Sequence, residues 1–476
     1  MKVILTLLIL ATIELSAGLK NLTLHQALTL LDQNNIEIEI ARYEAMMKKL
    51  DIAAVKAKNF GTLDISVTAL RSNDAGNVFG FKVQSREASF ADFGFADFMG
   101  ALGQGVQQSA MVSGGVPNFA AFSQGLAQNG AKILAIEPKA LNYPKARTHY
   151  ITKATFKIPL FTGGMLTNYK KITKKLYEMS KLDTAKVRSI KRFELKKTFY
   201  NIGLVNNYIS NLSNIKRNIQ KLKSVIKEMQ KEGYAVETDY LEVDAKLAEV
   251  EAMLDQARLN KRLAYQFLSF LLNRDVDSVR APKRPPHKPT VTKEVIEERS
   301  LDVAKAKLGL EITNDAIAVE KAKFLPKVGA FAEYGYADNK LLPKSIAKKD
   351  FYTVGVQATW NLFNGGADKA SLEKAKLNRL KVAAQVQLAK KGMWLKAQKL
   401  QSEIKSLSSR VRSFAKQYKF AHKVFLTYRE KYKEGIATIT DLLIKQSKEI
   451  EMLLKLLKVK NERNEKILEL QKLING

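Results

Sequence analysis

The chain contains two consecutive copies of one structural unit, and this duplication limits its fold more than any other feature of the sequence. The motif KEGxAxxTDxL occurs at 231–241 and again at 433–443, so that its glycines, Gly233 and Gly435, stand 202 residues apart. The segments PLFTGG at 159–164 and NLFNGG at 361–366 have the same offset. Unrelated lysine-rich helices would not keep one register over so long a stretch, so we interpret the chain as two repeats.

Each repeat is expected to contain two strands and a long helical hairpin. From Tyr352 to Leu362, apolar residues alternate with polar or small ones, which is the two-residue period of a strand. A pair of glycines then ends the strand, and no proline interrupts 164–231 or 366–433. A continuous helix of that length measures roughly 100 Å at about 1.5 Å per residue.

The returning helix of the first hairpin has a coiled-coil pattern. Its apolar residues recur at spacings of three, four or seven, which places them on one face of a helix. This seam consists of Val243, Leu247, Val250, Leu254, Ala257, Ala264, Leu268 and Leu271. The seam predicts packing against neighbouring helices rather than against a globular core.

The repeats and their flanking segments define the expected domains. Lys2, the short apolar run 3–13 and the small residues at 15–17 predict a signal peptide, with a buried N-terminal helix as the alternative. A cluster of prolines marks a linker between the repeats. The predicted boundaries are 1–17 for the signal peptide, 18–273 for the first repeat, 274–292 for the linker and 293–476 for the second repeat. Within the first repeat we expect a helix, strand 61–72, loop 73–145, strand 146–161 and hairpin 164–273. Within the second repeat we expect a helix, strand 325–337, strand 350–363 and hairpin 366–475.

The loop 73–145 is far longer than its counterpart in the second repeat. It is rich in Gly, Ala and Phe, for example at 79–81 and 90–99. Because so many phenylalanines are unusual in a disordered segment, we expect an ordered surface loop with short helices. The alternatives are a disordered insertion and a plug or cap over the mouth of a barrel.

The composition excludes several kinds of chemistry. The chain has no cysteine, which removes disulfides, thiol catalysis and Cys-ligated metals. Its four histidines are scattered without helical metal-ligand spacing, and no GxxxxGK[ST] phosphate-binding loop occurs. We therefore expect a protein that is not an enzyme and has no cofactor or metal. The net charge of +32 raises nucleic acid or an anionic membrane as partners, but the charge is spread along helices as on a solvated surface.

The number of strands predicts an oligomer. A transmembrane β-barrel needs about eight or more strands, and the chain offers four strand signals. Two copies would give eight strands and three copies twelve, and strand count alone leaves this choice open. The expected fold class is a mixed α/β membrane protein, mostly α. Its long coiled-coil helices would form a helical tunnel, or α-barrel, that continues into an oligomeric transmembrane β-barrel.

With these features the sequence resembles the TolC family of outer-membrane efflux proteins. The residues that carry the resemblance are PLFTGG, NLFNGG, the two KEGxAxxTDxL motifs and the opening segment Leu22-Thr23-Leu24-His25-Gln26-Ala27-Leu28. The resemblance implies a homotrimer in the cell outer membrane, in contact with outer-membrane lipid, with its helical tunnel in the periplasm. It also implies a periplasmic adaptor protein and an inner-membrane pump of the RND or ABC type as partners, and no nucleic acid.

The resemblance assigns roles to the two KEGxAxxTDxL motifs, which would lie at the hairpin tips. It implies a periplasmic gate made by Asp441, Tyr432 and Asp239. It implies adaptor docking at the tip residues Gly233, Ala235, Thr238, Gly435, Ala437 and Thr440. From the residues themselves we expect the glycines to end the outgoing helices in a left-handed conformation. We expect Thr238 or Asp239, and Thr440 or Asp441, to cap the returning helices.

Two positions depart from the family pattern. Ile444 stands where the family can place a second acidic residue, one turn after Asp441, and Ala437 stands where it can place a gating arginine. A double acidic ring, with the cation selectivity that it would give, is therefore not expected. The leading functional interpretation is an outer-membrane export duct of a tripartite efflux or type I secretion system. The alternatives are a basic coiled-coil protein that binds nucleic acid and a trimeric surface scaffold or adhesin.

Overall fold

The computed structural model describes residues 18–112, 114–342 and 345–474 of the chain. The predicted signal peptide 1–17 lies outside the described residues, as does Asn475 at the expected end of the second hairpin. None of the helices in the described ranges is both long enough and apolar enough to cross a membrane.

The chain folds into two compact units, and each unit combines segments from both repeats. One unit contains the described residues up to 52, together with 171–317 and 373 onward. The other contains 53–170 and 318–372. The compact units therefore cut across the repeats that the sequence predicts, because matching parts of the two repeats pack together.

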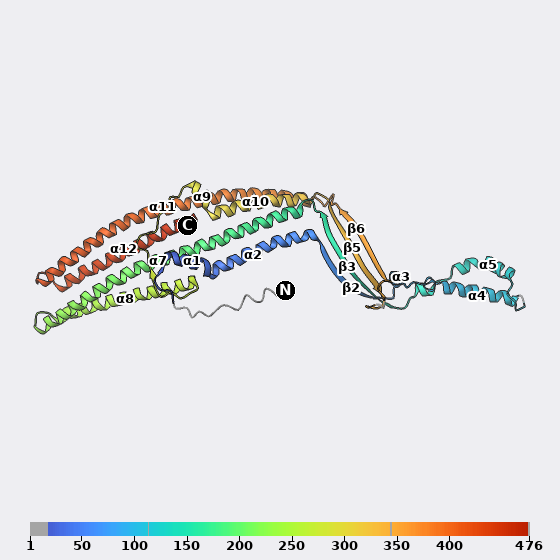
Figure 1. Cartoon of the computed structure of the whole chain (residues 1–476), viewed down its shortest axis with the longest axis horizontal. Coiled ribbons are helices and arrows are strands. Elements are labelled where there is room, and N and C mark those ends of the chain that lie inside the picture. Colours follow the sequence, from blue (N-terminus) through green and yellow to red (C-terminus); the bar gives the residue numbers. More distant parts are fainter. Residues whose placement is uncertain (1–17, 113, 343–344, 475–476) are drawn as a thin grey trace. The chain divides into compact units, whose positions relative to one another are not determined.

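The second unit is built on a four-stranded antiparallel sheet (Figure 1). Its strands are β2 (Thr62–Ser72), β3 (Arg147–Phe161), β5 (Lys327–Asp338) and β6 (Asp350–Thr359), in the order β2-β3-β5-β6. Strand β6 ends four residues before the expected end at 363. The register explains the difference, because Thr359 pairs with Lys327, the first residue of β5, and later residues have no partner on that strand.

The two faces of the sheet differ in polarity, as the alternation predicts. One face exposes Leu63, Ile65, Val354 and Val356, each more than 60% accessible. The opposite face carries polar side chains, among them Lys153, whose Nζ lies 2.9 Å from Oε1 of Glu333. An apolar outer face and a polar inner face are typical of strands in a transmembrane barrel.

The sheet is open at both edges within the described chain. Strands β2 and β6 each pair with one neighbour, β3 and β5 respectively. A long apolar edge strand with unpaired N–H and C=O groups promotes pairing with another chain. Further copies that continue the sheet would satisfy both edges.

The first unit contains most of the two helical hairpins. The first hairpin consists of α7 (Met165–Lys231) and α8 (Glu237–Leu272), and the second of α11 (Ala367–Lys433) and α12 (Ile439–Leu473). Helices α7 and α11 have 67 residues each, as expected from the common offset. The predicted seam of α8 is confirmed, because all its members are buried except Ala264, which is partly buried. Side chains from all four helices share one apolar cluster, which includes Leu212, Val250, Phe425 and Leu443.

Shorter elements brace the hairpins in this unit. They are α1 (Leu24–Asn34), α2 (Ile36–Ala57), α9 (Lys293–Arg299), α10 (Leu301–Ala322) and the two-stranded parallel pair β1 (Leu22–Thr23) with β4 (Val279–Arg280). The linker that contains β4 is held to the second hairpin by side-chain amides. Nε2 of Gln401 donates to the carbonyl of Val291 at 2.8 Å, and Nε2 of Gln471 donates to that of His287 at 2.7 Å.

The long segment between β2 and β3 is helical. It contains α3 (Ala75–Gln84), η2 (Phe90–Phe93), α4 (Phe95–Val112), α5 (Phe119–Leu134) and α6 (Lys139–Asn142). Its counterpart between β5 and β6 contains no helix among the described residues of 339–349. The second unit therefore carries a helical insertion at one strand connection and a short connection at the other.

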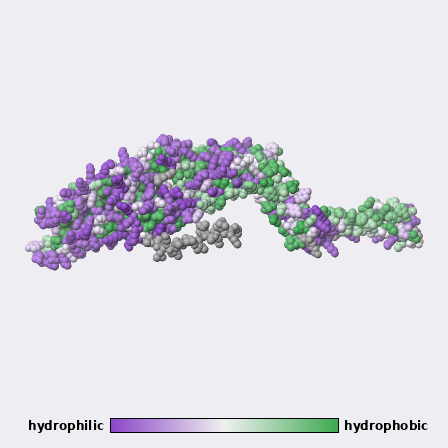
Figure 2. All heavy atoms as spheres, viewed as in Figure 1, coloured by the Kyte–Doolittle hydropathy of each residue, from purple (hydrophilic) through white to green (hydrophobic). Residues whose placement is uncertain are grey.

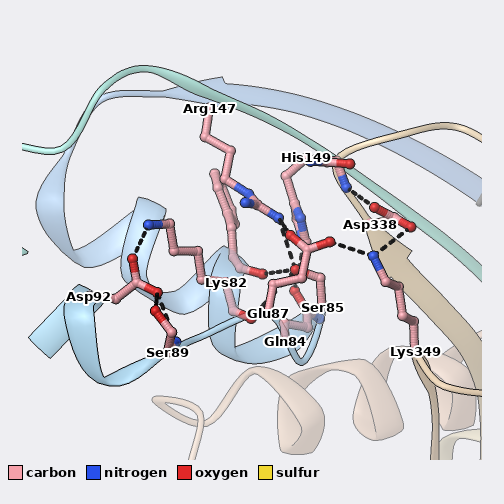
Figure 3. Close-up of polar contacts among 12 residues, drawn as sticks. Lys82, Gln84, Ser85, Glu87, Ser89, Asp92, Arg147, His149, Asp338 and Lys349 are labelled. Atoms are coloured by element: carbon pink, nitrogen blue, oxygen red, sulfur yellow. Dashed lines mark hydrogen bonds and ion pairs between the residues drawn. The ribbon is translucent and has the colours of Figure 1, made fainter.

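Ion pairs fix the base of this insertion to the sheet (Figure 3). Glu87 pairs with Arg147 at the start of β3 and with Lys349 before β6. Lys349 also lies 2.9 Å from Asp338 at the end of β5. Burial alone would raise the pKa of Glu87, but hydrogen bonds from Lys349 and Arg147 outweigh it and hold the pKa below its usual value. Glu87 therefore stays ionised and joins the insertion to both strand connections.

Replacing Glu87 with glutamine is expected to loosen the base of the insertion. The variant removes the negative charge that two cations share, so limited trypsin digestion should cleave after Lys82 about tenfold faster. Because the folded pKa of Glu87 is lowered, its contribution is present above the ordinary glutamate pKa and is lost as the pH falls through the folded value. Glu137→Gln, at an exposed position of the same segment, is the control. Equal cleavage rates in the two variants would contradict this account.

Candidate functional site

The outgoing helices of the two hairpins end at equivalent glycines in the same conformation. Gly233 and Gly435 have φ values of +78° and +75°, so the predicted left-handed helix ends are confirmed. After Gly435, the N–H of Ile436 donates to the carbonyl of Lys431 at 2.8 Å and closes the turn. No atom lies within 4 Å of a Cβ added at either glycine. The backbone angle, and not crowding, is therefore the reason for glycine here.

The predicted caps of the returning helices are wrong by two or three residues. Helix α12 begins at Ile439, and Thr438 is its cap; Thr438 Oγ1 accepts from the N–H of Asp441 at 3.1 Å. Asp441 is the third helical residue, and its Oδ2 accepts from the backbone N–H of Thr438 at 3.3 Å. This is a capping box, with aspartate in the position usual for glutamate. The sequence TITD contains two threonines, and only the first has an acid three residues later.

In the first repeat the same box is incomplete. Val236 takes the place of the threonine and provides no side-chain cap for α8. Asp239 still accepts from the N–H of Val236, at 3.2 Å. The two equivalent aspartates, Asp239 and Asp441, thus point back to the N-terminus of their own helix, where a negative charge is favourable.

The carboxylate of Asp441 is partly exposed, and its pKa is lowered. Hydrogen bonds from the side chain and the backbone N–H of Thr438 lower the pKa of Asp441. The group consequently remains ionised at a lower pH than an ordinary aspartate. An ionised, partly exposed carboxylate at a hairpin tip can attract cations, which is what the predicted gate position requires.

A hydrogen bond joins the two tips to each other. Thr440 Oγ1, in the second hairpin, donates to Oε2 of Glu242, in the first, at 2.8 Å. The sequence analysis did not identify Glu242 as a site residue. The common offset of 202 could have indicated it, because Glu242 corresponds to Ile444. The acid that is missing one turn after Asp441 is therefore present in the first repeat, one turn after Asp239.

Tyr432 lies at the edge of the apolar cluster shared by the two hairpins. Burial, and secondly the charge of Asp239, raise the pKa of Tyr432, so its hydroxyl stays protonated. Tyr432 also lines a groove between the hairpins, together with Ile219, Leu222, Phe425 and Leu442. The structure thus brings Tyr432 and Asp239 near each other, and it places Thr440 within hydrogen-bond distance of Glu242.

The remaining predicted tip residues are distributed between the surface and the cluster. Gly233, Thr238 and Gly435 are exposed, Ala235 packs against the cluster, and Ala437 is partly buried. Two exposed apolar side chains, Tyr234 and Ile436, follow the glycines at equivalent positions, 80% and 68% accessible. These two residues were not predicted, because they occupy variable positions of the motif. Their exposure makes each tip a small apolar surface.

Comparison with known proteins finds one sequence family and several solved structures to which the chain is similar. The sequence model described as "Outer membrane efflux protein" matches residues 294–476, which is the second repeat. The first repeat is related to it by the internal duplication. No curated protein sequence matches the chain.

Solved structures with the same fold cover nearly the whole chain. The CusC channel matches 98% of this chain and 96% of its own at 12% identity, with a TM-score of 0.72. The CmeC outer membrane channel of Campylobacter jejuni matches 95% and 85% at 13% identity, with a TM-score of 0.71. The open state of the MtrE outer membrane channel of Neisseria gonorrhoeae matches 95% and 89% at 15% identity, with a TM-score of 0.68. The nucleic-acid-binding and adhesin alternatives find no support in these comparisons.

Proposed function

We propose that this chain is a member of the outer membrane efflux protein family and forms the outer-membrane duct of a tripartite efflux or type I secretion system. The observation that carries the proposal is the four-stranded sheet with an apolar outer face and two open edges. Its strands β3 and β6 lead, through glycine pairs, into the long helices α7 and α11. One chain thus supplies a part of a barrel wall and a part of a helical tunnel wall.

Three copies would complete the duct. With four strands per copy, a trimer closes a barrel of twelve strands when β6 of each copy pairs with β2 of the next. A closed barrel has no unpaired backbone groups, which the membrane interior requires. The resemblance to the TolC family favours a trimer over the two-copy alternative.

The hairpin tips would form the periplasmic gate and the docking surface for an adaptor. Asp441, Tyr432 and Asp239 are the proposed gate residues, and Glu242 joins them on the basis of its bond to Thr440. Gly233, Ala235, Thr238, Gly435, Ala437 and Thr440 are the proposed docking residues. The exposed Tyr234 and Ile436 add the apolar contacts that such docking needs.

The proposed partners are a periplasmic adaptor and an inner-membrane pump. The description of the matching family indicates transport, and the proposed role requires no catalysis. The cargo would be selected by the pump, since a duct contacts its cargo loosely. Cell fractionation and planar-bilayer recording test the assignment: a detergent-stable oligomer from the outer membrane that conducts ions is expected. A cytoplasmic monomer without conductance would overturn it.

Replacing Asp441 with asparagine is expected to weaken cation block of the closed duct. Three copies bring three ionised carboxylates to one constriction, and asparagine keeps the size of the side chain but removes the charge. The concentration of a trivalent cation that halves the conductance should rise about fivefold or more. The matched control is Asp255→Asn, which removes the same charge at an exposed position of α8 away from the hairpin tip. Equal block in both variants would place the constriction elsewhere.

A further inference from the structure

The helices α4 and α5 form a hairpin of unusual composition within the second unit. No charged residue occurs between Asp97 and Lys132, although 26% of the residues in the whole chain are charged. In Figure 2 this hairpin is mainly green and white, whereas hydrophilic atoms cover the long helices. A surface element without charges is expected to have a partner.

The hairpin lacks a core of its own. Ser109 is the only buried residue in the described parts of α4 and α5. Five glycines lie inside these helices, and each costs roughly 0.5–1 kcal/mol relative to alanine. The glycines are Gly100, Gly103, Gly105, Gly125 and Gly130. Helices of 18 and 16 residues with such a sequence are marginal in water without further burial.

One face of the hairpin is apolar and another carries amides. Phe95, Met99 and Val106 are exposed on α4 at spacings of four and seven, which places them on one face of the helix. Phe119 on α5 is 82% exposed. A separate groove between the helices is lined by both amide and apolar side chains, and none of these four residues lines it. The amides of the groove include Gln104, Gln108, Gln124 and Gln128.

The base of the hairpin is rigid and lies beside an open edge of the sheet. The N–H of Lys139, in α6, donates to Oδ2 of Asp97 at 3.0 Å, and a Cβ on Gly94 would overlap Pro138. The ion pairs of Glu87 fix the preceding segment to β3 and to the connection before β6 (Figure 3). The insertion starts from β2, the edge strand that would pair with the next copy. In a closed trimer, three such hairpins would be neighbours around one barrel end.

We propose that the α4–α5 hairpins of the three copies pack on one another through their apolar faces and form a helical bundle at the outer end of the barrel. The outer end is the one where the strand connections lie, opposite the ends that continue into α7 and α11. This inference rests on the proposed trimeric duct. In a three-fold assembly the apolar residues of each hairpin would face those of its neighbours, and the glutamine faces would stay in contact with water.

The composition favours a second copy over a lipid surface as the partner. Helices that lie on membranes usually carry several Lys or Arg residues on their polar face, whereas α4 and α5 carry mainly Gln, Asn and Ser, with Lys132 as their one basic residue. Amide side chains can both donate and accept hydrogen bonds between helices. The trimer would also hold the hairpins at a high local concentration, so a modest contact area is enough.

Cysteine cross-linking of the full-length protein tests the proposal, because the chain has no natural cysteine. The two test variants are Val106→Cys, on the apolar face, and Gln108→Cys. Position 108 lies about 200° around the helix axis from position 106. A short bismaleimide added to outer membranes should give at least about tenfold more covalent dimer at position 106 than at 108. Phe119→Cys is a second position on the apolar face and should behave like 106.

The outcomes separate this inference from the proposed function. Equal cross-linking at positions 106 and 108 would overturn the bundle alone. So would the absence of cross-linking at both positions in a protein that still migrates as a trimer and conducts ions. Absence of a trimer would overturn the duct as well. A fluorophore attached to the cysteine of Val116→Cys tests for contact with lipid instead. If its emission shifts to shorter wavelengths when phosphatidylcholine vesicles are added, and position 106 does not cross-link, the hairpin contacts lipid and the bundle is wrong.

Discussion

Replacing Phe199 with alanine is expected to lower the free energy of unfolding by about 3–5 kcal/mol, the usual cost of removing a buried aromatic side chain. Phe199 lies on α7 and is completely buried. Its cluster contains Leu31 of α1, Ile38 of α2 and Leu268 and Leu271 of α8. The side chain therefore joins both helices of the first hairpin to the N-terminal helices that brace it.

Thermal unfolding of the detergent-solubilised protein, followed by circular dichroism at a helix wavelength, measures this effect. Phe199→Leu is the control, because leucine keeps most of the buried apolar volume and should cost less than half as much. The expected result is a clearly lower melting temperature for alanine and a small decrease for leucine. Equal melting temperatures of the alanine variant and the unchanged protein would show that this cluster does not limit stability.

The sequence predicts the repeated parts of the fold well because each element occurs in two copies, and the pattern of one copy supports the assignment of the other. The offset of 202 predicts equal lengths for α7 and α11, and both have 67 residues. The alternation from Tyr352 predicts which face of β6 is apolar. The end of β6 was predicted too late, because alternation continues to Leu362 whereas pairing stops where β5 begins. Periodicity is local, and strand length depends on the partner.

The site is less predictable, because its contacts cross between hairpins. Gly233 and Gly435 are identifiable from sequence, since a left-handed helix end favours glycine. The cap was assigned to Thr440 or Asp441, and only the hydrogen bonds show that Thr438 takes this role. Glu242 became a site residue through a bond to a residue 198 positions away. No pattern within one helix contains that information.

The insertion between β2 and β3 shows a third reason why prediction from the sequence is limited. Its composition predicts order, and the segment is indeed helical, with α4 and α5 as its longest elements. Their positions could not be predicted, because glycines and glutamines interrupt the apolar spacing that normally marks an amphipathic helix. Helices of this kind depend on burial by a partner, and the sequence of one chain does not show where that partner packs.

Replacing Thr440 with valine is expected to favour the open state of the duct. Valine has the shape of threonine and lacks the hydroxyl that donates to Glu242. A net contribution of about 1 kcal/mol for this exposed hydrogen bond corresponds to a shift of about fivefold per chain in the opening equilibrium. If the three copies open together, the shifts multiply, and the mean conductance of the reconstituted duct should rise accordingly.

The duplication provides the matched control for this variant. Thr238 occupies the same position in the first repeat, and the structure gives its hydroxyl no bond to the second hairpin among the described contacts. Thr238→Val should therefore leave the conductance unchanged, and Thr440→Ser, which keeps the hydroxyl, should do the same. Glu242→Ala added to Thr440→Val should cause little further opening, since both changes remove one bond. Additive effects of the two changes would mean that Thr440 and Glu242 act separately, and that the tips are held closed by the aspartates and Tyr432 instead.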